Sequence, residues 1–270
     1  MFNTLFRYVS EVFQSRSLPT FIIIGAQKSG TSSLYAYLAE HPQLVPSSNK
    51  EVHFFDAGLD PDINNYKKGE AWYRSHFSLK KDLDASQKNF EASPLYLFNP
   101  EAPHRIYNHI PTVKIIAVLR NPTERAISQY FHEKSLNKEL LPIYEAFLAE
   151  EDRLSMALKN KDYKDSNFIH ASYKTRGRYK EQLDRYFELF NKEKILILNS
   201  EDLFLRTEYT LKQVFNFLEV DADYKVKNRK ARNVSHNRIK VEPHVYEYLN
   251  DYFKPHNKAL SEMLGKEFEW

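Results

Sequence analysis

The stretch FIIIGAQKSGTSS combines two glycines with a lysine and several hydroxyl side chains in a pattern that suits an anion. A Walker A loop reads G-x-x-x-x-G-K-[ST]. Gly25 and Gly30 keep that glycine spacing here, but the lysine stands at position 28 and position 31 is threonine. A strand that ends in glycine and a helix that follows would direct backbone N–H groups and the positive helix end at one point. The pattern predicts a phosphate-binding loop not built for a nucleoside triphosphate; an ordinary strand-to-helix turn is the alternative.

A second group, KEVHFFD at residues 50–56, places Glu51 and His53 two positions apart. In an extended backbone, side chains two positions apart point to the same side. A carboxylate beside an imidazole can take the proton of a hydroxyl group, provided that both face the phosphate loop. The alternative is an exposed pair with no common function.

A third group, VLRNPTERAISQY, joins the end of an apolar run to a helix. Asn121 suits the N-cap, Pro122 suits the first helical position, and Ser128 follows two turns later. Ligands of parallel α/β sheets bind at the carboxyl ends of the strands. Arg120 is therefore placed to hold a second phosphate, with a structural salt bridge as the alternative, whereas Arg125 is assigned a structural role.

Apolar runs rich in β-branched residues alternate with segments of helical periodicity. The expected strands cover residues 21–25, 88–93, 113–120 and 193–200. The expected helices cover residues 31–40, 101–109, 122–134, 143–158, 179–190, 203–218 and 243–264. This alternation predicts an α/β fold of three layers with a parallel central sheet. Residues 20–270 are expected to form a single domain, and residues 1–19 an amphipathic helix that packs on it or contacts a membrane surface or a partner.

Composition narrows the class of protein. The 270 residues carry 39 basic and 36 acidic side chains, a balance that does not indicate a nucleic-acid partner. The absence of cysteine excludes disulfides and thiolate nucleophiles. No transmembrane segment and no signal peptide are expected, so the predicted location is cytoplasmic. Residues 225–240 contain seven basic residues and no acidic one, which indicates a solvated surface or a flap over an anionic ligand.

In combination, IIIGAQKSGTSSL, KEVHFFD, LRNPTERAISQY and the ending YFKPHNKALSEMLGKEFEW resemble the PAPS-dependent sulfotransferases, most closely the heparan sulfate glucosaminyl 3-O-sulfotransferases. The resemblance implies a P-loop NTPase-like sulfotransferase fold in a bacterial-type cytoplasmic enzyme. It implies transfer of the sulfuryl group of 3'-phosphoadenylyl sulfate (PAPS) to a hydroxyl, with adenosine 3',5'-bisphosphate as product and no metal. The acceptor is expected on a sugar, a lipid or a small metabolite, because Ala92 replaces a lysine of the polysaccharide enzymes and their disulfide loop is missing.

The resemblance also implies a role for each matched residue. Glu51 matches the catalytic base, assisted by His53, and both of them match acceptor-site residues together with Asp56. Lys28 matches the residue that neutralises the leaving oxygen. The implied cofactor contacts are Lys28, Ser29, Gly30, Thr31, Ser32 and Ser33 in the loop, Arg120 and Ser128 at the 3'-phosphate, and Lys230, Arg232 and Arg238 in the basic segment.

Two other functions stay open on the sequence. The first is a P-loop kinase or NTPase with a degenerate loop, against which the missing lysine at position 31 argues. The second is a non-enzymatic polyanion-binding module that uses the basic residues 225–240.

Overall fold

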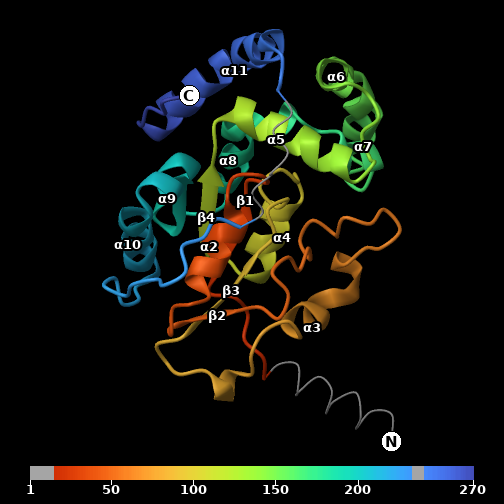
Figure 1. Ribbon diagram of the computed structural model, residues 1–270. Coiled ribbons are helices and arrows are strands. Elements are labelled where there is room, and N and C mark those ends of the chain that lie inside the picture. Colours follow the sequence, from red (N-terminus) through yellow and green to blue (C-terminus); the bar gives the residue numbers. More distant parts are fainter. Residues whose placement is uncertain (1–14, 233–239) are drawn as a thin grey trace, which may run out of the picture.

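A parallel sheet of five strands lies at the centre of the molecule (Figure 1), in a computed structural model that describes residues 15–232 and 240–270. The strand order is β2-β3-β1-β4-β5, and every neighbouring pair is parallel. The strands are β1 (Phe21–Gly25), β2 (Leu44–Pro46), β3 (Lys88–Ala92), β4 (Lys114–Leu119) and β5 (Ile195–Asn199). The predicted α/β fold with a parallel central sheet is confirmed.

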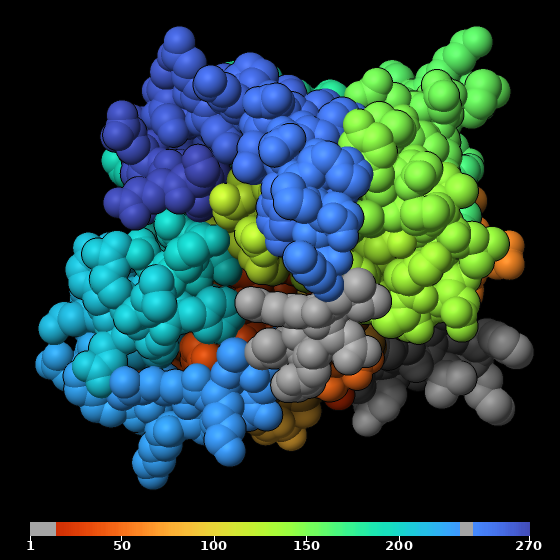
Figure 2. Space-filling view, turned by 45° about the horizontal axis from the view of Figure 1, so that its top comes forward, coloured from red at the N-terminus to blue at the C-terminus, as the bar shows by residue number. Residues whose placement is uncertain are grey.

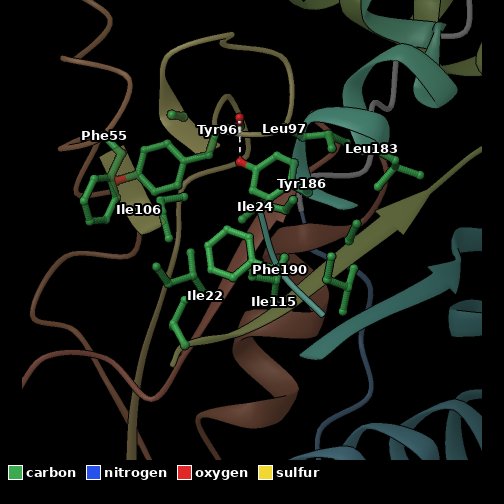
Figure 3. Packing of buried hydrophobic residues seen from close by; sticks show 14 of the residues in the cluster. Ile22, Ile24, Phe55, Tyr96, Leu97, Ile106, Ile115, Leu183, Tyr186 and Phe190 are labelled. Atoms are coloured by element: carbon green, nitrogen blue, oxygen red, sulfur yellow. Dashed lines mark hydrogen bonds between the residues drawn. The ribbon is translucent and has the colours of Figure 1, made fainter. Parts of the chain in front are cut away.

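Helices cover both faces of this sheet. Because side chains alternate along a strand, Ile22 and Ile24 of β1 point to one face, and Phe21 and Ile23 to the other; all four are fully buried. The first face packs on α4 and α8, whose residues Ile106 and Leu183 are seen in Figure 3, and on the end of α11. The second face packs on α2, α9 and α10. These helices are α2 (Thr31–Leu38), α4 (Ala102–His109), α8 (Tyr179–Phe187), α9 (Ser200–Leu205), α10 (Thr207–Leu218) and α11 (Pro243–Leu264). The sheet and its two helical layers are the predicted three layers.

A further group of helices lies beyond the carboxyl ends of the strands (Figure 1). It consists of α5 (Pro122–Ser135), α6 (Ile143–Asn160) and α7 (Ser166–His170), and the first half of α11 packs against it. Phe147 of α6 and Leu249 of α11 belong to its fully buried core. The remaining elements are α3 (Gly69–Arg74) and the short 3-10 helices Tyr66–Lys68, Lys80–Asp82, Thr175–Gly177 and Lys192–Lys194. The group of α5, α6 and α7 lies next to the edge of the sheet at which β1 and β4 end.

Some element boundaries differ from those that periodicity predicts. The helix expected at residues 203–218 is two helices, since Arg206 leaves the helical conformation with φ −129° and ψ 47°. The first of them begins earlier, because the Asn199 side chain accepts a hydrogen bond from the Glu201 N–H and caps it. β2, α3 and α7 were not expected, and none of them is longer than six residues.

The expected N-terminal helix is described only at its end. Residues 1–14 lie outside the described residues, so the helix remains a prediction there. Residues 15–19 are not helical: Arg16 forms an antiparallel bridge with Leu79, and Leu18 packs against the core. No helix in the described part of the chain has the length and apolar character needed to cross a membrane.

Gly25 offers a test of the packing at the end of β1. A Cβ atom at this position would lie 2.6 Å from Leu97 Cβ and 2.9 Å from Pro94 O, and neither atom is the end of a flexible side chain. We expect Gly25→Ala to lower the free energy of unfolding by about 2 kcal/mol, measured by urea denaturation. Gly265→Ala is the matched control, because φ there is +60° but no atom lies within 4 Å. It should cost about 1 kcal/mol, and equal losses for the two variants would contradict the packing argument.

Candidate active site

The loop between β1 and α2 has the geometry of an anion site. Gly30 precedes α2 in the left-handed conformation with φ +94°, and no side chain caps the helix. Its carbonyl accepts from the N–H groups of Ser33 and Leu34, each at 3.0 Å, so the helix starts immediately after the loop. The first turn of α2 therefore directs its N–H groups and dipole toward the loop. The strand, loop and helix occur in the predicted order.

Two cationic side chains lie together at this loop. Arg120 follows β4, the neighbour of β1, and its Nη1 donates to the Lys28 carbonyl at 3.1 Å. Burial lowers the pKa of the Lys28 ammonium, and the charge of Arg120 lowers it further. The salt bridge of Arg120 is loose, with its Nη2 3.5 Å from Glu124 Oε2. A bound anion would relieve the repulsion between these two cations.

The start of α5 is fixed as the sequence predicted. The Asn121 side chain accepts from the N–H groups of Thr123 and Glu124 at 3.0 and 3.2 Å, and Pro122 opens the helix. Ser128 lies two turns along α5 and is half-buried. Arg125 of the same helix is fully buried and donates to the Tyr173 carbonyl.

Glu51, His53 and Asp56 form a hydrogen-bonded chain. His53 Nε2 lies 3.0 Å from Glu51 Oε2, and His53 Nδ1 lies 2.6 Å from Asp56 Oδ2. The expected route to this pairing was an extended backbone, and that expectation is wrong. His53 has φ +51°, and the segment forms no strand. The two side chains meet although His53 lies in the left-handed region.

The charges of this chain are strongly coupled. Burial alone would raise the pKa of Glu51, but the hydrogen bond from His53 and the charge of Lys50 lower it to about 2. Burial alone would lower the pKa of His53, but the charge and hydrogen bonds of Asp56 and Glu51 raise it to about 10. At neutral pH an imidazolium thus lies between two carboxylates. Glu51 is the more accessible carboxylate, since its side chain is 34% exposed and that of Asp56 is 0% exposed.

The acidic chain faces the cationic loop. The charge of Glu51 acts on Lys28 and raises its pKa against the larger lowering effects. The segment is held beside β3 by the Ala92 N–H, which donates to the Lys50 carbonyl at 3.1 Å. The pKa of His132 in α5 responds to both charged groups. Burial and the charge of Lys28 lower this pKa, and the charge of Glu51 raises it. Sequence reasoning missed His132, although it lies one helical turn beyond Ser128.

The basic segment approaches α2 through its backbone. The Arg232 N–H donates to Ser33 Oγ at 2.9 Å, and the Tyr37 hydroxyl donates to the Arg229 carbonyl at 2.9 Å. Arg229 itself pairs with Glu208 at 2.6 Å. Figure 2 shows red and orange atoms from the start of the described chain recessed between this segment, in light blue, and α9 and α10, in cyan.

Of the three cofactor contacts predicted in the basic segment, two lie within the described residues. The side chains of Lys230 and Arg232 are exposed. Arg238 lies outside the described residues. Within residues 15–232 and 240–270, no three His, Cys, Asp or Glu side chains are grouped so as to hold a metal ion.

Comparisons with known proteins identify the family of this chain. A family model described as "Sulfotransferase domain" matches residues 18–259. The crystal structure of a sulfotransferase from Alicyclobacillus acidocaldarius superposes with a TM-score of 0.76 at 28% identity, covering 93% of this chain and 98% of that one. The chain therefore belongs to the sulfotransferase family.

Related proteins carry this domain in different settings. The chain is 28% identical to the membrane-associated sulfotransferase kil1 of Dictyostelium discoideum, over 94% of this chain and 66% of that protein. It is also 28% identical to the heparan sulfate glucosamine 3-O-sulfotransferase 5 of Mus musculus, over 94% of this chain and 75% of that protein. The bifunctional heparan sulfate N-deacetylase/N-sulfotransferase 1 of Caenorhabditis elegans is 31% identical over 76% of this chain. The match covers only 22% of the length of that relative.

The raised pKa of His53 predicts a pH dependence of stability. Its pKa is about 10 in the folded protein and about 6.5 when unfolded, so the folded state binds more protons between these values. His53 therefore stabilises the fold fully below pH 6.5, and this contribution is lost as the pH rises through 10. Between pH 7.5 and 9.5 the free energy of urea unfolding should fall more steeply than in His53→Gln, by at most about 1.4 kcal/mol per pH unit. Parallel pH profiles for the two proteins would show that His53 is neutral in the fold.

Proposed function

We propose that this protein transfers the sulfuryl group of PAPS to a hydroxyl acceptor, with Glu51 as the general base. The observation that supports the proposal is that two groups of opposite charge lie close enough for the charge of Glu51 to act on Lys28. The α2 N-terminus with Lys28 and Arg120 forms the cationic half, and Glu51 with His53 and Asp56 forms the acidic half. Membership of the sulfotransferase family supports the same reaction.

The residues at the loop fit an anionic nucleotide. An uncapped helix N-terminus, a half-buried ammonium and a guanidinium at the end of β4 are suited to phosphate and sulfate oxygens. The loop residues from Lys28 to Ser33 would hold the 5'-phosphosulfate, and Arg120 and Ser128 the 3'-phosphate. Lys230 and Arg232 are exposed beside α2 and would add charge to the same site.

In the mechanism, PAPS would supply an electrophilic sulfuryl group whose bond to the phosphate oxygen breaks as the bond to the acceptor oxygen forms. Glu51 takes the proton of the acceptor hydroxyl. The protonated His53 donates to Glu51 Oε2 and holds the carboxylate in place, while Asp56 fixes the imidazole from the other side. Lys28 neutralises the charge that grows on the departing phosphate oxygen.

The acceptor is proposed as a hydroxyl on a sugar, a lipid or a small metabolite. Relatives named for heparan sulfate support a carbohydrate as one such acceptor. Here Ala92 lies fully buried at the end of β3, so this position supplies no cation to a polyanionic chain. A cytoplasmic location and a metal-independent reaction remain proposals of the same kind.

Neither alternative function accounts for both halves of the site. In a kinase or NTPase the strand next to the loop supplies an aspartate for magnesium, whereas β4 runs into Arg120. A polyanion-binding module would use the basic segment, but Lys225 and Arg229 both lie near Glu208, at 3.9 and 2.6 Å. Neither function needs the Glu51–His53–Asp56 chain.

Calorimetric titration with adenosine 3',5'-bisphosphate tests the nucleotide site. Binding should be unchanged by magnesium and stronger than binding of ATP. Arg120→Ala should weaken the bisphosphate by about 10-fold to 100-fold, because a charge-assisted contact to its 3'-phosphate is lost. The affinity for adenosine 5'-phosphate should change by less than about threefold.

Arg74→Ala is the matched control, since Arg74 pairs with Glu70 on α3 and has no contact with the loop. Equal losses for the two nucleotides in Arg120→Ala would remove Arg120 from the 3'-phosphate site. A preference for magnesium-ATP would reopen the kinase hypothesis.

Glu51→Gln tests the base. The amide keeps the shape of the side chain but accepts no proton, so turnover with an acceptor should fall by about 10²-fold to 10⁴-fold. Bisphosphate affinity should stay within about threefold, because the base belongs to the acidic half. Glu70→Gln, which changes a carboxylate held by Arg74 and His109, should leave turnover unaffected. A fully active Glu51→Gln enzyme would disprove the assignment.

A further inference from the structure

A buried carboxylate next to the acidic half gathers three hydroxyl groups. Glu91 of β3 is fully buried. Its Oε2 accepts from the Ser93 hydroxyl at 2.7 Å. Its Oε1 accepts from the hydroxyls of Tyr73 at 2.7 Å and Tyr96 at 3.1 Å. The proposed reaction uses none of these groups, yet burying a carboxylate is costly unless its hydrogen bonds are satisfied in this way.

Two of the three hydroxyls also accept hydrogen bonds from the backbone of His53 and Phe54. The His53 N–H donates to Ser93 Oγ at 3.0 Å, and the Phe54 N–H donates to the Tyr96 hydroxyl oxygen at 2.9 Å. A hydroxyl group has one proton, and both of these protons are directed at Glu91. Both oxygens therefore present lone pairs to the two consecutive N–H groups. The carboxylate sets the direction of each bridge.

His53 needs such anchors because of its backbone conformation. A φ of +51° is unfavourable for a residue with a Cβ atom and persists where the surroundings hold it. Its N–H is held by Ser93, and its carbonyl accepts from Asn65 Nδ2 at 3.1 Å. In this conformation the ring contacts Glu51 and Asp56.

We propose that Glu91 is a positioning residue that holds His53, through Ser93 and Tyr96, in the conformation that orients the Glu51 carboxylate. The catalytic part of this inference rests on the proposed function, since it takes Glu51 as the base. The structural part does not, because it concerns where the imidazole lies in the free protein. Figure 3 shows Tyr96 beside Phe55 in the core, where Tyr186 donates to its carbonyl at 2.9 Å. Tyr96 is therefore held both at its hydroxyl, by Glu91, and at its backbone carbonyl, by Tyr186.

The protonation of Glu91 supports this geometry. Burial raises the pKa of Glu91 to about 7, against the lowering effects of its hydroxyl donors and of the His53 charge. The groups that face it are Tyr73 from α3, Tyr96, His53 and, from α2, Tyr35, whose pKa is raised by burial and further by the charge of Glu91. The ionised form accepts all three hydroxyls, whereas the neutral form must donate one proton. The bridges should therefore rearrange as Glu91 titrates.

The first experiment follows the His53 imidazole by NMR in the free protein. In the wild type its signals should shift with a midpoint near pH 7, separately from the ionisation of His53 near pH 10. Glu91→Gln keeps the shape but does not titrate, so this shift should be missing from the variant. The same shift in Glu91→Gln would overturn the proposal.

The second experiment separates positioning from general support of the core. Ser93→Ala and Tyr96→Phe each remove one bridge to the catalytic segment, whereas Tyr73→Phe removes a donor that leads no further. All three variants should lower the urea midpoint by similar amounts. The value of kcat should fall about tenfold in the first two and less than twofold in Tyr73→Phe, with KM for the nucleotide unchanged in all three.

The outcomes of the second experiment are distinct. If kcat stays at the wild-type value in all three variants, or falls equally in all three, the network only supports the core and the proposal is overturned. A wild-type protein without sulfuryl transfer would refute the proposed function, and the NMR comparison would still decide whether Glu91 positions His53.

Discussion

The parallel pairing of β1 with β3 and β4 is the constraint on which the site depends. Phe21 at the start of β1 pairs with Phe90 on one side and with Lys114 on the other, so the three strands run in register. Strands that run in the same direction end at one edge of the sheet. The chain leaves that edge as the loop with Lys28 after β1, as Ser93 after β3 and as Arg120 after β4. Segments far apart in the sequence thus meet because the hydrogen bonds of the parallel sheet fix where each strand ends.

The sequence predicted those features whose interactions are local. The loop and the Asn121 cap depend on residues within a few positions of each other, and both have the expected geometry. The break at Arg206 was missed because the hydrophobic periodicity of 203–218 continues across it. The Glu51 and His53 pairing was expected for a wrong reason, since a left-handed residue replaces the extended backbone. The sequence offers no glycine at that turn, although glycine adopts a positive φ most readily.

Glu91 shows why the rest of the site required three dimensions. In the sequence it is one of three polar residues in a five-residue strand, between Phe90 and Ala92. Two of its partners, Ser93 and Tyr96, follow closely, but Tyr73 comes from α3, a helix that the sequence did not predict. The onward contacts reach His53 and a neighbouring N–H some forty positions earlier. Burial decides whether such a carboxylate is a surface charge or an anchor, and local spacing does not encode burial.

The charges of the two halves also explain how the proposed chemistry would be ordered. In the free protein Glu51 is held by Lys50 and by the imidazolium of His53, which together make it a weak base with a pKa of about 2. Lys28 is the opposite case, because burial and Arg120 destabilise its charge. An anion bound at the loop would raise the pKa of Lys28, and an acceptor hydroxyl that replaces Lys50 at Oε1 would raise the basicity of the carboxylate. Each half would then reach its reactive state only when its own ligand is present, which disfavours loss of the sulfuryl group to water.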